Sequence, residues 1–113
     1  MIERYPVQIM PRAERDIDSI FSWLLERSPA GASNWLAALD STVQRMATDP
    51  ESFATALEAK VLGSNLKQCL FKTPKGRNYR AVFLFENDAV FILRVRGPGQ
   101  PPLQDDELDL ALP

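Results

Sequence analysis

Residues 79–96 read YRAVFLFENDAVFILRVR, and the fold depends on them. The two arms are rich in β-branched and aromatic residues and flank a polar segment, a pattern typical of a β-hairpin. With Glu86-Asn87-Asp88 as the loop, Phe85 lies opposite Ala89 and one face of the hairpin is wholly apolar. A two-residue loop would bring Arg94 and Arg96 onto that face, so the burial pattern predicts the longer loop. The apolar face then holds Ala81, Phe83, Phe85, Ala89, Phe91, Leu93 and Val95.

Basic side chains gather on the second face of this hairpin, where the predicted register places Arg80 opposite Arg94. Like charges directly opposed on a sheet repel, so the two side chains either extend into solvent or hold an anion. Residues 60–96 carry eight basic side chains against two acidic ones. This asymmetry indicates an anionic partner for the sheet, unless the helices or the acidic tail neutralise it within the chain.

Two helices are predicted before the hairpin. Apolar residues recur at helical spacing over Arg12–Arg27, and Ser28-Pro29 then begins a second helix that continues to about Thr48. The short link makes the two helices a tight antiparallel hairpin. Tyr5–Met10 reads as a short strand, for which Pro6 favours an edge position.

The segment between the second helix and the β-hairpin is less regular. Ala54–Lys60 is compatible with a short helix, and residues 66–73, LKQCLFKT, read as a strand. If Lys72 pairs near Arg80, then Lys72, Arg80 and Arg94 form a row across three neighbouring strands. Together the elements predict an α+β fold, with a helical hairpin packed on one face of a four-stranded, mainly antiparallel sheet.

Length and composition bound the architecture. The 113 residues are enough for one hydrophobic core, and the net charge is −2. We expect a single domain over residues 1–100 and an acidic C-terminal tail over residues 101–113, in which several leucines either pack as a short amphipathic piece or stay disordered. The sequence has no run of 18 apolar residues and no signal peptide is visible, so we expect no membrane contact.

The residue types present exclude several kinds of catalytic site. The sequence contains no His, which excludes Ser-His-Asp and Cys-His chemistry. Its single Cys69 cannot form an internal disulfide, which fits a cytoplasmic protein. Nothing matches a P-loop, a dinucleotide fingerprint or a zinc-ligand spacing, so we expect no cofactor and no metal.

Several short motifs occur in a recognisable order. Ala13-Glu14-Arg15-Asp16-Ile17 opens the first helix, and Tyr79-Arg80 opens one strand of the hairpin. Val90–Val95, followed by Arg96-Gly97, closes the last strand. The second helix is framed by Pro29, Ala32, Leu39, Met46 and Asp49-Pro50. Over about residues 3–100 this arrangement resembles the RelE/ParE superfamily of toxins from bacterial type II toxin–antitoxin systems, the plasmid stabilisation protein type.

The resemblance implies a small cytoplasmic toxin that is held inactive by a cognate antitoxin encoded beside it. RelE-like members cleave messenger RNA on the ribosome, and ParE-like members poison DNA gyrase. RelE-like cleavage uses basic residues on the middle strands and usually a His or Tyr just after the last strand. By position, the candidate catalytic residues are Arg80, Arg94 and Lys72. Where the terminal acid or base is expected, this chain has Gly97-Pro98-Gly99.

The sequence leaves three functions open. The first is a ParE-like toxin that inhibits growth by acting on DNA gyrase. The second is a RelE-like, ribosome-dependent endoribonuclease without the usual terminal base, and the third is a degenerate member with weak toxicity. In each case, further candidates for contact with an anion or a partner are Arg77, Lys75, Arg96 and Tyr79.

Overall fold

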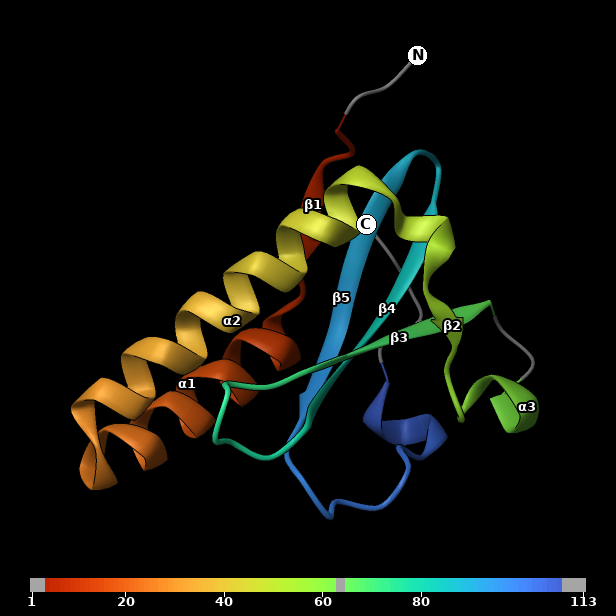
Figure 1. Ribbon diagram of the computed structural model, residues 1–113. Coiled ribbons are helices and arrows are strands. Elements are labelled where there is room, and N and C mark those ends of the chain that lie inside the picture. The colour runs from red at the N-terminus through yellow and green to blue at the C-terminus, as the bar shows by residue number, and fades with distance from the viewer. Residues whose placement is uncertain (1–3, 63–64, 109–113) are drawn as a thin grey trace.

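The computed structural model describes residues 4–62 and 65–108 and has an α+β fold (Figure 1). A five-stranded mixed sheet in the order β1-β5-β4-β3-β2 carries the antiparallel helices α1 and α2 on one face. The predicted architecture is confirmed, with β2 as an additional short strand at one edge. The elements are β1 (Val7–Ile9), α1 (Pro11–Arg27), α2 (Pro29–Thr48), the 3-10 turn η1 (Pro50–Ser52), β2 (Ala54–Thr55), α3 (Ala59–Leu62), β3 (Leu66–Phe71), β4 (Tyr79–Glu86), β5 (Ala89–Arg96) and the 3-10 turn η2 (Asp105–Glu107).

The hairpin of β4 and β5 is present, but the predicted register is wrong. Glu86 pairs with Ala89, so the loop is Asn87-Asp88 alone, and both loop residues have positive φ angles, 53° and 58°. These angles belong to the mirror-image turn that favours two-residue hairpin loops. At the other end of the pair, Arg80 lies opposite Arg96 and not opposite Arg94.

A β-bulge in β5 keeps Arg94 and Arg96 off the helix-covered face although the loop has only two residues. Phe83 pairs with Ile92 and Val82 pairs with Arg94, which leaves Leu93 as an extra residue on β5. An extra residue breaks the strict alternation of side chains between the two faces. Val95 therefore lies on the helix-covered face with Ala81 and Phe83, as the sequence predicted, although regular alternation from a two-residue loop would have placed it on the opposite face.

The sheet is buried on both faces, whereas the sequence predicted a single apolar face. Phe83 belongs to the core beneath the helices, and Phe91 belongs to a second core on the opposite face. The first core includes Trp35, Leu39, Met46, Cys69, Phe71, Ala81, Val90, Ile92 and Val95. The second includes Met10, Ala56, Leu66, Val82, Leu84, Leu93, Leu103 and Leu108.

Local sequence signals account for the helical hairpin. Ser28 ends α1, and its backbone N–H donates a hydrogen bond to the Leu24 carbonyl at 2.8 Å. The same residue begins α2, because its hydroxyl accepts the Gly31 N–H at 3.0 Å. One residue thus caps both helices, and Pro29 follows it at the first helical position.

The edges of the sheet are formed by its shortest strands. β1 pairs in parallel with β5 and lies at one edge, as Pro6 predicted. β2 occupies the other edge, where the sequence had suggested a helix over Ala54–Lys60. β3 pairs with β4 so that Leu70 lies opposite Arg80. Lys72 follows the end of β3, so the predicted row of Lys72, Arg80 and Arg94 is wrong.

The segment after β5 covers the second face of the sheet. Leu103 and Leu108 are buried there against residues of β4 and β5. The predicted acidic tail thus packs on the sheet up to residue 108, whereas the domain boundary near residue 100 stays a prediction. Leu110 and Leu112, which the sequence offered as part of an amphipathic piece, lie outside the described residues.

Candidate functional site

The Arg80 side chain is bound by a carboxylate of the same chain. Its guanidinium donates to both oxygens of Glu58, with Nη1–Oε1 at 2.7 Å and Nη2–Oε2 at 2.6 Å. Glu58 also accepts the backbone N–H of Leu103 at 2.8 Å, and its exposed fraction is only 3%. One buried carboxylate therefore joins the segment after β2, the start of β4 and the C-terminal segment.

Glu58 remains ionised in this environment. Burial alone would raise the pKa of its carboxyl and is the largest single influence. The hydrogen bonds from Arg80 and from the Leu103 amide act in the opposite direction, and together they lower the pKa from 4.5 to about 2. The pair is consequently a charged, bidentate ion pair at neutral pH.

Arg94 is bound in a similar way by the first helix. Asp16 of α1 accepts from Arg94 Nε at 2.7 Å and from Nη2 at 3.0 Å, and it also accepts the Val95 N–H at 2.9 Å. The Glu107 carbonyl accepts from Arg94 Nη1 at 2.8 Å. The hydrogen bonds to Asp16 raise the pKa of the Arg94 guanidinium, against the opposing effect of burial.

Arg96 holds the segment that follows its own strand. Its exposed fraction is 7%, Nη2 donates to the Pro101 carbonyl at 2.9 Å, and Nη1 lies 3.7 Å from Glu107 Oε2. The sequence left open whether the basic face meets an external anion or is neutralised within the chain. For Arg80, Arg94 and Arg96 the second alternative holds, and their predicted roles in catalysis or anion contact stay predictions.

The other candidate residues are Lys72, Lys75 and Arg77 in the β3–β4 connection, residues 72–78, and Tyr79, the first residue of β4. Lys72, Lys75 and Arg77 are exposed, and no carboxylate of the described part of the chain lies within ion-pair distance of them. Tyr79 is half-buried, with its ring centroid 5.5 Å from that of Trp35. The structure thus separates three solvent-facing cations from the internally paired arginines.

A cleft of about 660 Å³ lies where this connection meets the helical hairpin. Arg77 and Tyr79 line it together with Trp23 and with Gly97-Pro98, the segment found where the resemblance leads one to expect an acid or base. Trp23 is 53% exposed, and the Arg27 guanidinium stacks on its ring at 3.7 Å from the centroid. Arg77 is therefore the cation that the cleft offers to a ligand or partner.

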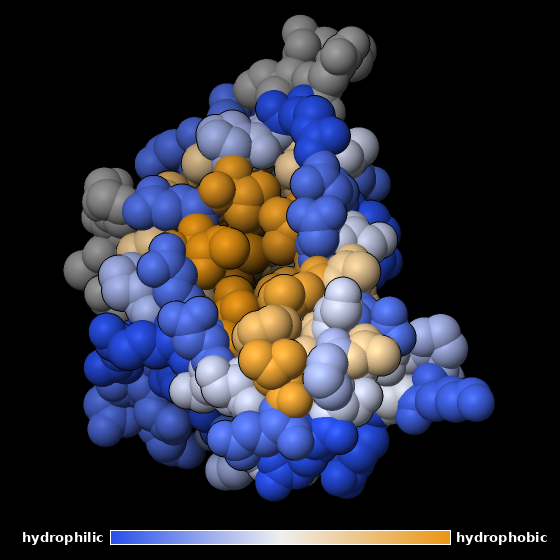
Figure 2. All heavy atoms as spheres, turned by 90° about the vertical axis from the view of Figure 1, so that its left-hand side faces the viewer, coloured by the Kyte–Doolittle hydropathy of each residue, from blue (hydrophilic) through white to orange (hydrophobic). Residues whose placement is uncertain are grey.

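The helical side of the molecule also leaves apolar surface uncovered. Besides Trp23, the side chains of Leu25 and Leu36 are exposed on the two helices. Figure 2, which shows the left-hand side of Figure 1, displays apolar side chains gathered in a hollowed area with a polar surround. Contiguous exposed apolar surface is typical of protein-binding faces.

The sequence reasoning missed both carboxylates that organise the site. In the sequence Asp16 is only a member of the motif that opens the first helix, and Glu58 lies in the irregular segment before the β-hairpin. A signal for Glu58 does exist, because it is the only charged residue in the run Phe53-Ala-Thr-Ala-Leu-Glu-Ala. An isolated acid among apolar residues is buried only with a partner.

Comparison with known proteins identifies the family to which the chain belongs. Residues 7–100 match the model of the family described as ParE toxin of type II toxin-antitoxin system, parDE. No curated protein matches the chain. No helix in the described part of the chain is both long and apolar enough to cross a membrane.

Proposed function

The chain belongs to the family of ParE toxins of type II toxin–antitoxin systems, and we propose on that premise that it inhibits growth by acting on DNA gyrase. We further propose that a cognate antitoxin neutralises it by direct binding. In this proposal the toxin works by protein contact and carries out no chemistry on RNA.

The internal pairing of the sheet arginines carries this proposal. Cleavage of RNA through its 2′-hydroxyl needs a base, an acid and cations for the developing phosphorane charge. Arg80 and Arg94 are already bound by Glu58 and Asp16, so a phosphate would have to displace a hydrogen-bonded carboxyl group from each. Lys72 does not lie in a row with them. This arrangement favours contact with a protein over RNA cleavage.

Two features of the surface support a protein partner. The exposed cations Lys72, Lys75 and Arg77 follow one another in a single connection, and the neighbouring helical hairpin exposes Trp23. Aromatic and Arg side chains are the residue types that most often dominate protein–protein affinity. An acidic or apolar partner surface would complement this end of the molecule.

The test uses purified protein, purified gyrase and supercoiled plasmid DNA. We expect the protein to trap gyrase on cleaved DNA, which appears as linear plasmid after detergent and protease treatment. The protein encoded by the neighbouring gene, added in excess, should abolish the effect. A parallel reaction in a translation extract, read by primer extension, checks the messenger RNA. Growth arrest with cleaved messenger and unaffected gyrase would overturn the proposal.

A further inference from the structure

The outer edge of β3 is only partly covered by β2. β2 pairs with Lys67 and Gln68, and the Ala56 N–H donates to the Leu66 carbonyl at 2.9 Å. In an antiparallel ladder alternate residues direct their N–H and C=O groups to the same side, so Leu66, Gln68 and Leu70 face this edge. β2 ends its pairing at Gln68, which leaves the Leu70 N–H on an open edge, while the Leu70 carbonyl accepts a weak hydrogen bond from the Cys69 thiol at 3.6 Å.

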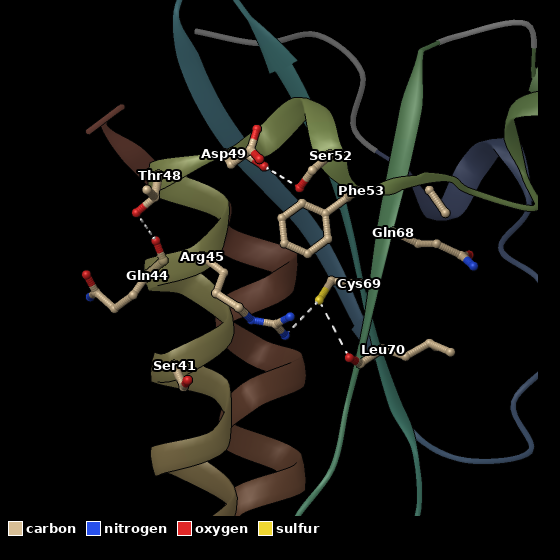
Figure 3. Close-up of a pocket in the computed structure, with 11 residues that line it drawn as sticks. Ser41, Gln44, Arg45, Thr48, Asp49, Ser52, Phe53, Gln68, Cys69 and Leu70 are labelled. Carbon is tan, nitrogen blue, oxygen red and sulfur yellow. Dashed lines mark hydrogen bonds between the residues drawn. The ribbon is translucent and has the colours of Figure 1, made fainter. Parts of the chain in front are cut away.

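A groove follows this open edge between α2 and β3 (Figure 3). η1 and Phe53 close one end, and Arg45 extends from α2 across the groove toward Cys69 on β3. The part of the groove between η1 and Leu70 has a volume of about 810 Å³. A further part of about 320 Å³ shares Arg45 and Leu70 with it and continues to Lys72.

Two cations, Arg45 and Lys72, line the groove. Arg45 Nη2 lies 3.5 Å from the Cys69 sulfur, and the guanidinium lies 5.7 Å from the centroid of the Phe53 ring. Among the described residues no carboxylate forms an ion pair with Arg45 or with Lys72. Asp49 is the acidic residue in the lining. Arg45 and Lys72 are therefore two cations without an ion-pair partner among the described residues, and both lie at this edge.

We propose that this groove binds an extended acidic segment of the antitoxin, which adds to the sheet as a strand beside Leu70. The inference rests on the proposed function, because it names the binding site of the proposed neutralising partner. Backbone hydrogen bonds to an open edge supply affinity in this mode of recognition, and side-chain contacts supply specificity. Here carboxylates of the segment would pair with Arg45 and Lys72.

A second copy of the chain fits this groove less well. A symmetric dimer places the same residues on both sides of the interface. It would bring Arg45 and Lys72 of each copy close to the same cations of the other, and like charges at an interface cost affinity. An acidic polypeptide is the occupant that complements both the charge and the backbone edge.

The first test measures the affinity of the purified full chain for the product of the neighbouring gene. The double substitution Arg45→Glu and Lys72→Glu should weaken binding by at least roughly tenfold, since it replaces attraction by repulsion. Lys60→Glu makes a change of the same type on α3, away from the groove, and should alter affinity by less than about threefold. Circular dichroism and thermal unfolding check that each variant is folded.

The second test addresses the backbone. Leu70→Pro removes the outward N–H and should weaken binding, whereas Leu70→Ala keeps the N–H and should bind nearly as well as the wild type. The Leu70 side chain is 55% exposed, so the alanine substitution costs little packing. Hydrogen exchange should show the Leu70 amide protected in the complex and not in the free chain.

The outcomes separate the inference from the proposed function. If the wild type binds the neighbouring product, and the charge-reversed variant binds equally with Leu70 unprotected, the inference is wrong while neutralisation by binding stands. If the wild type does not bind that product, the proposed neutralisation fails and the inference fails with it. Protection of the Leu70 amide by RNA in place of the neighbouring product would also overturn the inference.

Discussion

Replacement of Glu58 by Gln should destabilise the fold strongly at neutral pH and hardly at all in acid. The carboxyl has a pKa of about 2 in the folded protein and an ordinary value of 4.5. At about 1.4 kcal/mol per pH unit, this difference corresponds to about 3 kcal/mol of stability. A domain of this size is stable by only about 5–15 kcal/mol, so Glu58→Gln removes a large part of the total.

The direction of the pH dependence follows from the lowered pKa. The contribution of Glu58 is fully present above about pH 4.5 and is lost as the pH falls toward 2, where the folded protein also takes up the proton. Urea unfolding at a series of pH values measures this contribution directly. The difference in unfolding free energy between wild type and Glu58→Gln should be about 3 kcal/mol at pH 7 and should approach zero near pH 2.

Two further variants make the experiment specific. Glu51→Gln removes an exposed carboxylate from the nearby η1 turn and should change stability by less than about 0.5 kcal/mol. Adding Arg80→Met to Glu58→Gln should recover stability, because it removes the cation that the first substitution leaves unpaired. A Glu58→Gln protein as stable as the wild type at pH 7, or a difference that persists unchanged to pH 2, would refute the reasoning.

Three other perturbations follow from the same structure. Asp16→Asn should cost about 1–3 kcal/mol in urea unfolding, because it weakens the bonds to Arg94; a cost within error of zero would contradict the geometry. Asp88→Gly should stabilise the protein by about 0.5–1 kcal/mol, since glycine adopts a positive φ at no steric cost, and a lower midpoint would argue against the two-residue turn. Trp23→Ala should relieve growth arrest or weaken antitoxin binding without changing the midpoint, while Leu57→Ala, also exposed, should do neither; equal effects would exclude the helical side as a binding surface.

Local signals in the sequence were sufficient for the helices and for the existence of the β-hairpin. The N-cap at Ser28 and the apolar stripes depend on residues close together in the chain, and the two helices occur where they were predicted. The hairpin register depended on an assumption of unbroken alternation, which the bulge at Leu93 violates. Nothing in the local sequence identifies that bulge, because it satisfies burial on two faces at once.

The ion pairs of Arg80 and Arg94 could not be predicted from the sequence, because their partners lie far away in the chain. Val82 and Leu84, the neighbours of Arg80 on its own strand, are apolar, and its partner Glu58 lies 22 residues away in the chain. Arg94 and its partner Asp16 are separated by 78 residues. The excess of basic residues is visible in the sequence, but the fold brings the neutralising carboxylates to them from distant positions in the chain.

The second core has a consequence for the order in which the protein folds. Leu103 and Leu108, which cover this core, follow all five strands in the chain. The contacts that close this face span long stretches of chain, such as the 94 residues between Arg12 and Asp106. Contacts so distant in sequence form slowly. We therefore expect the second core to close late in folding, after the local hairpin of β4 and β5 has formed.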